Sequence, residues 1–346
     1  MNGIVVIDKP QGMTSHDVVS VLRRKTGEKR VGHTGTLDPM ATGVLPVFIG
    51  KATRLIEYAG RPGDPEAKVY RVVMKMGLCT DTQDIWGTPI AFSGEGDVVL
   101  PGEGGVFIPD EEEIKRVLKG FEGPGRQRPP MYSAVKVGGR KLYEYARKGV
   151  EIDEADVKER EIYIKHIIVN DVDIAAGEVR FDVHCSKGVY IRTLCADAGR
   201  LLGCGAVMSG LIRLKSDGFS IEDAVSLDSL EGEGCPAPAT TAAGPLAAPP
   251  VDMDGSPTTT AAGPPALLPM DAPLSWMPRA ELSSEGAVAF ARGQKAEYTR
   301  VAAFGDSPFG GAGEGKNPVC VYSPEGFIGI GNISENGLIN PEKVII

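Results

Sequence analysis

The stretch 32–46 contains the clearest candidate for a reactive group, the carboxylate of Asp38. Its fifteen residues include three glycines, two prolines and three threonines, and Asp38 stands between Gly35 and Pro39. This composition fits neither an amphipathic helix nor an alternating strand, so it predicts a rigid loop. Catalytic groups often sit on such loops, where a single acid held in one pose can attack an electrophilic carbon or remove a proton.

A purely structural interpretation of Asp38 is an Asx-turn, in which its side chain bonds the nearby backbone ahead of Pro39. An isolated Thr-Leu-Asp-Pro segment would favour that interpretation. Here His33, the glycines and the threonines share the same loop, and their concentration favours a functional site.

The bulk composition indicates a water-soluble globular chain. It has 346 residues, 42% hydrophobic and 24% charged, with no apolar run near the ~20 residues needed to cross a bilayer. The N-terminus lacks the pattern of a signal peptide, so we expect a cytoplasmic protein without a membrane partner. The six cysteines form no Cys-x-x-Cys pair, and no metal site is expected.

The formal net charge of −9 conceals a strong segregation of charge. Residues 91–113 contain seven acids and no base, whereas residues 126–148 contain seven bases and one acid. A second basic group lies at 23–30. Because the 126–148 group also contains Tyr132, Tyr143 and Tyr145, it predicts a surface that binds nucleic-acid phosphates.

Hydrophobic patterns predict an α+β fold with a central, mainly antiparallel sheet flanked by helices. Strands are expected at 4–7, 69–76, 162–169 and 179–185, and helices after Thr14, after Asp110 and over 191–202. No regular βαβ alternation is present. Near the end, 319–322 and 327–330 flank Ser-Pro-Glu-Gly and predict a hairpin in a small β-rich domain.

Composition changes sharply at about residue 231. Residues 231–266 are mostly Ala, Pro, Thr and Gly, with too few large apolar side chains to offset the entropy of ordering. We therefore expect a catalytic domain at 1–230, a disordered linker at 231–266 and a C-terminal domain at 267–346.

Six blocks of the sequence together resemble a known enzyme family, the TruB-type bacterial tRNA pseudouridine synthases. They are 3–15 (with Gly-Ile-Val-Val-Ile-Asp-Lys-Pro at 3–10), 32–46, Lys-Val-Tyr-Arg at 68–71, Thr-Asp-Thr-x-Asp at 80–84, Pro-Pro-Met-Tyr-Ser-Ala-Val-Lys at 129–136, and Cys-Ser-Lys-Gly-Val-Tyr-Ile-Arg-Thr-Leu at 185–194. One block could match by chance, but six in the family's order make a specific resemblance. The long 231–266 segment and the 211–219 block depart from the family pattern.

The resemblance implies a pseudouridine synthase fold with a PUA-like RNA-binding domain at the C-terminus. It implies that Asp38 is the essential catalytic carboxylate, that Arg192 pairs with it, and that Tyr70 stacks on the target base. Substrate contacts are implied for a further set of residues: His33, Thr36, Asp84, Lys136, Lys187 and Tyr190. Tyr190 and Arg192 would face the same side if their segment were extended.

The implied activity is the isomerisation of uridine to pseudouridine at position 55 in the T-arm of tRNA. The target base would be flipped out of its stack, without a cofactor or an obligate protein partner, by a monomeric enzyme. Two alternatives use the same surface: an RNA-guided pseudouridine synthase, and a non-catalytic tRNA chaperone. The wording Asp-Pro-Met-Ala-Thr-Gly at 38–43 favours the stand-alone bacterial type over the guided type.

The composition of 231–266 generates a first prediction. Limited proteolysis should cut there first and give fragments of ~230 and ~80 residues, because exposed segments without burial are preferred sites of cleavage. Replacing 231–266 by a short Gly/Ser bridge should leave enzymatic activity near that of the full chain. Resistance to protease, or loss of activity in the shortened chain, would contradict the proposed division into domains.

Overall fold

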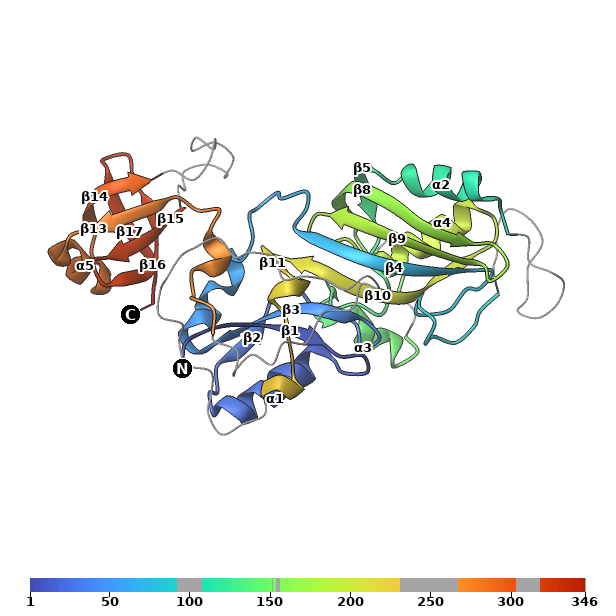
Figure 1. Cartoon of the computed structure of the whole chain (residues 1–346), viewed down its shortest axis with the longest axis horizontal. Helices are drawn as coiled ribbons and strands as arrows, with labels where there is room; N and C mark the ends of the chain where they lie inside the picture. The colour runs from blue at the N-terminus through green and yellow to red at the C-terminus, as the bar shows by residue number, and fades with distance from the viewer. Residues whose placement is uncertain (92–107, 151, 154–155, 231–266, 303–317, 346) are drawn as a thin grey trace. The chain divides into compact units, whose positions relative to one another are not determined.

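The computed structural model describes residues 1–91, 108–150, 152–153, 156–230, 267–302 and 318–345 (Figure 1). The chain divides into two compact units, which are described separately. One comprises Met1–Leu37, Val44–Pro62 and Asp217–Ile346, and the other comprises Asp38–Gly43 and Gly63–Ser216. We call them the terminal unit and the central unit.

The central unit is built on an antiparallel run of strands in the order β10-β4-β9-β8-β5. Their bounds are β4 Lys68–Met76, β5 Gly123–Gln127, β8 Arg160–Asp173, β9 Glu178–Cys185 and β10 Ala206–Ser216. The first residues of β3 (Thr42–Ile49) pair with β10 in parallel, through Thr42 with Ile212 and Gly43 with Arg213. The sheet is therefore mixed but mainly antiparallel. In β9 every second residue from Val179 to Cys185 is buried, which confirms the alternation expected from sequence.

Two of the helices in the central unit are α2 and α4, and α2 has the expected side-chain cap. Helix α2 (Glu111–Lys119) begins at Asp110, whose side chain accepts a hydrogen bond from the backbone nitrogen of Glu113. Its buried stripe is Ile114, Val117 and Leu118. Helix α4 (Ile191–Leu201) follows β9. Between β5 and β8, the short strands β6 (Lys136–Val137) and β7 (Arg140–Lys141) form a hairpin that leads into α3 (Leu142–Ala146).

The N-terminal part of the terminal unit contains β1 (Gly3–Lys9), α1 (Ser15–Thr26), β2 (Val31–His33) and η1 (Gly50–Tyr58), with β12 (Val225–Ser226) from farther along the chain. Strand β1 pairs with β12 in parallel, and β2 pairs with the later residues of β3. The expected capping box at Thr14 and the left-handed C-cap at Gly27 are both present. Short turns η3 (Ile221–Asp223), η4 (Asp228–Leu230) and η5 (Ala272–Leu274) complete this part.

A five-stranded closed barrel forms the C-terminal part of the terminal unit, in the order β13-β14-β17-β16-β15. Its strands are β13 Arg279–Leu282, β14 Ala296–Ala302, β15 Pro318–Ser323, β16 Gly326–Ile333 and β17 Leu338–Val344. All neighbours are antiparallel except β13 and β15, which close the barrel in parallel. Helix α5 (Ser284–Ala291) supplies Phe290 to the core. The predicted hairpin is confirmed, because β15 and β16 pair from Pro318–Asn332 to Ser323–Gly326.

The fold class is thus confirmed as a mixed sheet with helices and a C-terminal β domain, while the domain boundaries at 230 and 267 stay predictions. The linker and most of the acidic segment lie outside the described residues. Within the described part, no helix is long and apolar enough to span a membrane. Five cysteines are free thiols there, four of them buried, and burial raises the pKa of Cys185 to about 12.

The parallel contact between β3 and β10 depends on a glycine. Gly43 has a φ of +95°, and a Cβ added there would lie 2.3 Å from the backbone oxygen of Arg213. Gly218 has nearly the same φ, +91°, but a Cβ there would meet nothing within 4 Å. The two glycines therefore separate the cost of backbone strain from the cost of a steric clash.

Gly43→Ala should lower the free energy of unfolding by more than about 3 kcal/mol, because strands β3 and β10 must separate to admit the methyl group. Gly218→Ala should cost only the ~1–2 kcal/mol of left-handed backbone strain. Urea denaturation of both variants measures the difference. Equal losses would show that β3 and β10 are not held at this close distance.

Candidate active site

Asp38 sits in a tight turn of the central unit. Its backbone carbonyl accepts a hydrogen bond of 3.1 Å from the backbone nitrogen of Ala41, and Pro39 occupies the position in the turn that favours proline. Met40 and Ala41 are buried and anchor the turn. Main-chain bonding therefore closes the turn, and the carboxylate of Asp38 has a partner on a distant segment of the chain.

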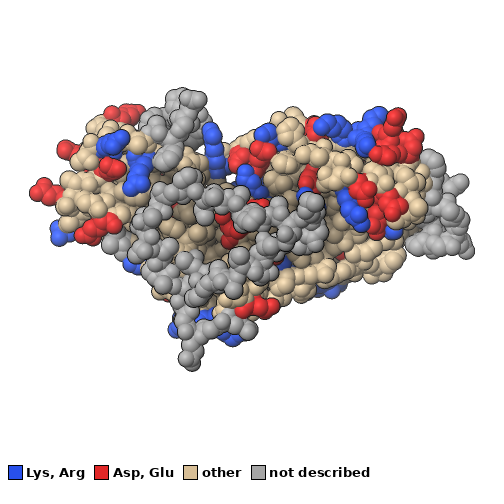
Figure 2. All heavy atoms as spheres, viewed as in Figure 1, with Lys and Arg blue, Asp and Glu red and all other residues tan. Residues whose placement is uncertain are grey.

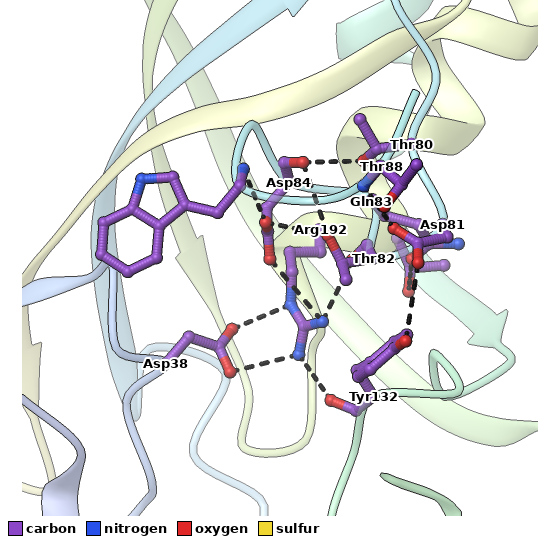
Figure 3. Close-up of polar contacts among 11 residues, drawn as sticks. Asp38, Thr80, Asp81, Thr82, Gln83, Asp84, Thr88, Tyr132 and Arg192 are labelled. Carbon is purple, nitrogen blue, oxygen red and sulfur yellow. Dashed lines mark hydrogen bonds and ion pairs between the residues drawn. The ribbon is translucent and has the colours of Figure 1, made fainter. Parts of the chain in front are cut away.

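That partner is Arg192, which binds both oxygens of the Asp38 carboxylate (Figure 3). Arg192 Nε lies 2.8 Å from Asp38 Oδ2, and Nη2 donates to Oδ1 at 3.1 Å. The arginine side chain is only 6% exposed, whereas the aspartate side chain is 33% exposed. A two-point ion pair of this kind orients the acid and favours its ionised form, while the exposure leaves it within reach of a substrate.

The guanidinium of Arg192 is held from two further directions. Nη1 donates to the backbone oxygen of Thr82 at 3.1 Å, and Nη2 donates to that of Tyr132 at 2.9 Å. Asp84 Oδ2 lies 4.0 Å from Nη1 and supplies a second negative charge. These contacts satisfy the donors of a buried cation, which would otherwise be strongly unfavourable.

The loop that supplies Thr82 and Asp84 is closed by its own hydrogen bonds. Thr80 Oγ1 donates to the backbone oxygen of Asp84 at 2.7 Å, and Thr82 Oγ1 donates to Asp84 Oδ1 at 2.9 Å. Gln83 takes a left-handed conformation with a φ of 63°. At Gly87 a Cβ would lie 2.2 Å from Thr82 Oγ1, so only glycine allows the loop to close this tightly. The Thr-Asp-Thr-x-Asp motif therefore builds a preformed support for Arg192.

The start of helix α4 positions Arg192 itself. Tyr190 is the N-cap residue and makes no side-chain cap, but the Gln127 side chain accepts from its backbone nitrogen at 2.7 Å and donates to its carbonyl at 3.0 Å. The extended geometry considered for 190–192 does not occur, because Arg192 is the second residue of the helix. Spacing by two therefore does not place Tyr190 and Arg192 on one face.

Three other predicted residues of the central unit lie in a strand, a hairpin and a turn. Tyr70 is buried in β4, between Val183 of β9 and Arg213 of β10. Lys136 is exposed in β6, and Lys187 is exposed in the turn before α4. Their roles at the base or at phosphates stay predictions. His33, half-buried in β2, and Thr36, exposed, belong to the terminal unit.

The predicted basic surface at 126–148 falls into two parts. Arg126 and Arg128 each lie 3.9 Å from a glutamate, Glu161 and Glu159 respectively. The remaining bases lie in the β6-β7 hairpin and directly after α3, and two of them, Lys141 and Arg147, lie within 5.4 Å of the centre of the Tyr143 ring. On the face drawn in Figure 2, Lys and Arg lie among Asp and Glu rather than in one large basic area. Positive charge at the hairpin is therefore a local feature.

Sequence reasoning missed three contributors to the site. Gln127 is a buried polar residue within a basic run. The neighbouring sequence gives no sign that its amide accepts a hydrogen bond from the backbone nitrogen of Tyr190, at the start of α4. Tyr132 and Thr82 belong to the motifs that resemble the family, but they accept hydrogen bonds from Arg192 through backbone oxygens, which residue type does not reveal. Among the described residues, no group of three His, Cys, Asp or Glu side chains is arranged to hold a metal ion.

Two family models match most of the first 239 residues. One is described as TruB family pseudouridylate synthase (N terminal domain) and matches residues 23–191. The other is described as tRNA pseudouridylate synthase B C-terminal domain and matches residues 192–239. Together they cover all the site residues named above.

Similar proteins include two named tRNA pseudouridine synthase B. The one from Alkaliphilus oremlandii is 47% identical over 67% of this chain and 70% of that protein. The one from Syntrophotalea carbinolica is 44% identical over 67% of this chain and 69% of that protein.

Solved structures share the fold at lower identity. A crystal structure of a Cbf5-Nop10-Gar1 complex contains a chain with a TM-score of 0.63 and 24% identity, covering 99% of this chain and 85% of its own. A structure of an H/ACA RNP bound to a substrate RNA containing 2′-deoxyuridine gives a TM-score of 0.62 and 21% identity over 99% and 85%. At this identity the likeness concerns the fold alone.

The buried arginine generates a prediction about stability. Arg192→Lys should lower the free energy of unfolding by about 1–3 kcal/mol, because one ammonium cannot reproduce the paired bonds to Asp38 and the two carbonyl contacts. The control is Arg200→Lys on the same helix, where an exposed arginine lies 3.9 Å from Asp197 and the change should stay within ~0.5 kcal/mol. Similar losses in both variants would mean that Arg192 contributes no more than a surface charge.

Proposed function

Because the chain belongs to the TruB family of pseudouridylate synthases, it is an isomerase that converts uridine to pseudouridine in tRNA, and we propose that it acts at position 55 in the T-arm with Asp38 as the catalytic carboxylate. The observation that carries the proposal is the two-point pairing of Asp38 with a buried, fully engaged Arg192. This arrangement supplies what the reaction needs at the nucleotide, a single ionised acid in a fixed pose.

The chemistry is an isomerisation, so every atom of the uridine is kept. The N1–C1′ bond breaks, the base turns, and a C5–C1′ bond forms; the proton leaves C5, and N1 gains one. Asp38 could attack C1′, remove a proton from C2′ to give a glycal, or add to C6 of the base. All three routes require the carboxylate rather than the acid form, and the Arg192 pairing favours that form.

Substrate engagement follows from the position of the target inside folded RNA. The base must leave its stack before a carboxylate can reach it, so we propose that the enzyme flips it out and that Tyr70 stacks against it. The β6-β7 hairpin with α3 would bind phosphates, and the C-terminal barrel would act as a PUA-like RNA-binding domain. His33, Thr36, Asp84, Tyr190, Lys136 and Lys187 would contribute further contacts.

Purified protein and an unmodified tRNA transcript are sufficient to test this function. Pseudouridine should appear at position 55 without added guide RNA or partner protein, and a transcript with cytidine at that position should yield none. Mapping by chemical modification and primer extension locates the product. Formation of pseudouridine only after a guide RNA is added would favour the RNA-guided alternative. Binding of tRNA without formation of pseudouridine would favour the chaperone.

Asp38→Asn should lower pseudouridine formation by at least about a thousandfold while the folded protein still binds tRNA, because the amide keeps the shape of the side chain but removes its charge. Asp182→Asn is the matched control: Asp182 also binds an arginine at two points, Arg71 at 3.0 Å each, but this pair joins the neighbouring strands β9 and β4, and its arginine is 54% exposed. Asp182→Asn should retain activity. Turnover in Asp38→Asn would remove Asp38 from the catalytic role.

Binding should weaken with salt despite the acidic composition, because phosphates meet local positive charge. Reversing Arg140, Lys141 and Arg147 to glutamate should weaken tRNA binding and flatten the slope of log affinity against log salt by about two to three. Reversing Lys115, Arg116 and Lys119 on the exposed face of helix α2 changes the net charge equally and is the control. Equal effects from both triples would show that only net charge matters and that the hairpin is not the RNA surface.

A further inference from the structure

The loop that supports Arg192 also exposes large apolar side chains. Trp86 is 56% exposed, and its neighbours Ile85 and Ile90 are 38% and 47% exposed. Single exposed apolar residues are ordinary, but three of them within six positions of one loop form a patch. Among the described residues, the Trp86 indole makes no ring or cation contact.

This loop holds Trp86 in place from both sides. The backbone nitrogen of Trp86 donates to Asp84 Oδ1 at 3.0 Å, and that of Gly87 donates to the Asp84 carbonyl at 3.1 Å. Ile85 is tied to β10, because its backbone nitrogen donates to the carbonyl of Met208 at 2.9 Å. A large aromatic side chain on a preformed backbone loses little conformational entropy when it binds a partner.

A short series of contacts links the backbone of Trp86 to Asp38, the proposed catalytic acid. Asp84 accepts from Trp86 through one carboxylate oxygen and faces Arg192 at 4.0 Å through the other, and Arg192 pairs with Asp38. Figure 3 shows Asp84, Thr82 and Asp38 grouped around the Arg192 guanidinium. The loop that carries Trp86 is thus bonded to the candidate active site, within one unit of the structure.

The charge of the loop limits what it can bind. Residues 80–90 include Asp81 and Asp84 and no lysine or arginine. These acids repel phosphates, so the loop cannot serve the RNA backbone, but the face of an indole can stack on any nucleobase. A single-stranded or flipped region of RNA next to the target offers such a base.

We infer that the indole of Trp86 stacks on an unpaired base of the tRNA next to the target uridine and helps to hold the opened T-loop during the reaction. The inference rests on the proposed function, since it takes the substrate to be tRNA. It assigns to the loop an apolar contact that is separate from the electrostatic contacts of the β6-β7 hairpin.

Binding measurements across a range of salt test this role. Trp86→Ala should weaken tRNA binding by about 5- to 150-fold, the equivalent of ~1–3 kcal/mol for one stacked base, with no change in the salt slope. Trp86→Phe should recover most of the loss, and Trp86→Leu, which is apolar without a π-face, should not. The control is Leu201→Ala on helix α4, another strongly exposed apolar residue, at 57%. Wild-type affinity in Trp86→Ala overturns the inference, and so does full recovery by leucine.

Fluorescence provides an independent readout, because the chain has only two tryptophans. In the Asp38→Asn, Trp276→Phe protein, Trp86 is the only emitter, and saturating tRNA should quench its emission. Trp276 is half-buried and donates to the Tyr58 carbonyl, so its replacement could disturb folding. The reverse comparison avoids that difficulty: wild type should lose emission on binding tRNA, and Trp86→Phe should lose much less.

The outcomes separate the stacking role from the proposed function. If tRNA binds the wild type and quenches its tryptophan emission but no pseudouridine forms, the proposed function is wrong and the stacking role of Trp86 is supported. If the wild type forms pseudouridine while Trp86→Ala binds tRNA with wild-type affinity and tRNA does not quench Trp86 emission, only the stacking inference is wrong. If Trp86→Ala instead changes only self-association in sedimentation, the patch is a contact between two copies of the chain, which would falsify the inference.

Discussion

The arrangement of the candidate site depends on one buried cation. Arg192 is almost fully withdrawn from water, and taking a guanidinium out of water is costly unless all its neighbours compensate. The compensation comes from Asp38, two backbone carbonyls and the nearby Asp84, which lie on three separate stretches of the chain. The same contacts that stabilise the charge therefore also bring these stretches together, and the Asp38 carboxylate is positioned as a consequence.

Local patterns allowed much of the fold to be predicted. The capping residues Thr14 and Asp110 form the bonds expected of them, the alternation in β9 identifies its buried face, and the Ser-Pro-Glu-Gly turn identifies the β15-β16 hairpin. Each of these signals lies within a few residues of the structure it determines. Strand order in the central unit, closure of the barrel by a parallel pair and the close approach at Gly43 arise between distant segments. No local pattern encodes them.

The residues of the candidate site likewise fall into those that the sequence identifies and those that only the folded structure brings into contact. Family motifs pointed to Asp38 and Arg192, and the structure pairs them. Helix α4 begins at Ile191 as the sequence predicts, so the extended geometry that would place Tyr190 and Arg192 on one face does not apply, and the Gln127 amide takes the place of a side-chain cap. The supporting carbonyls of Thr82 and Tyr132 could not be predicted from residue type, since every residue has a backbone carbonyl. Trp86 lay next to a recognised motif, but its exposure depends on a loop conformation that includes the left-handed Gln83.

The separation of the paired residues along the chain affects how the enzyme matures during synthesis. Asp38 and Arg192 are 154 residues apart, and the Thr82 and Tyr132 contacts span 110 and 60 residues. A ribosome releases the chain from the N-terminus, so Asp38 emerges long before the arginine that orients it. Closing such long loops is also slow compared with forming hairpins and helices. A nascent or truncated chain that ends before α4 therefore contains Asp38 but not its partner, and the paired arrangement arises only when most of the central unit has been made.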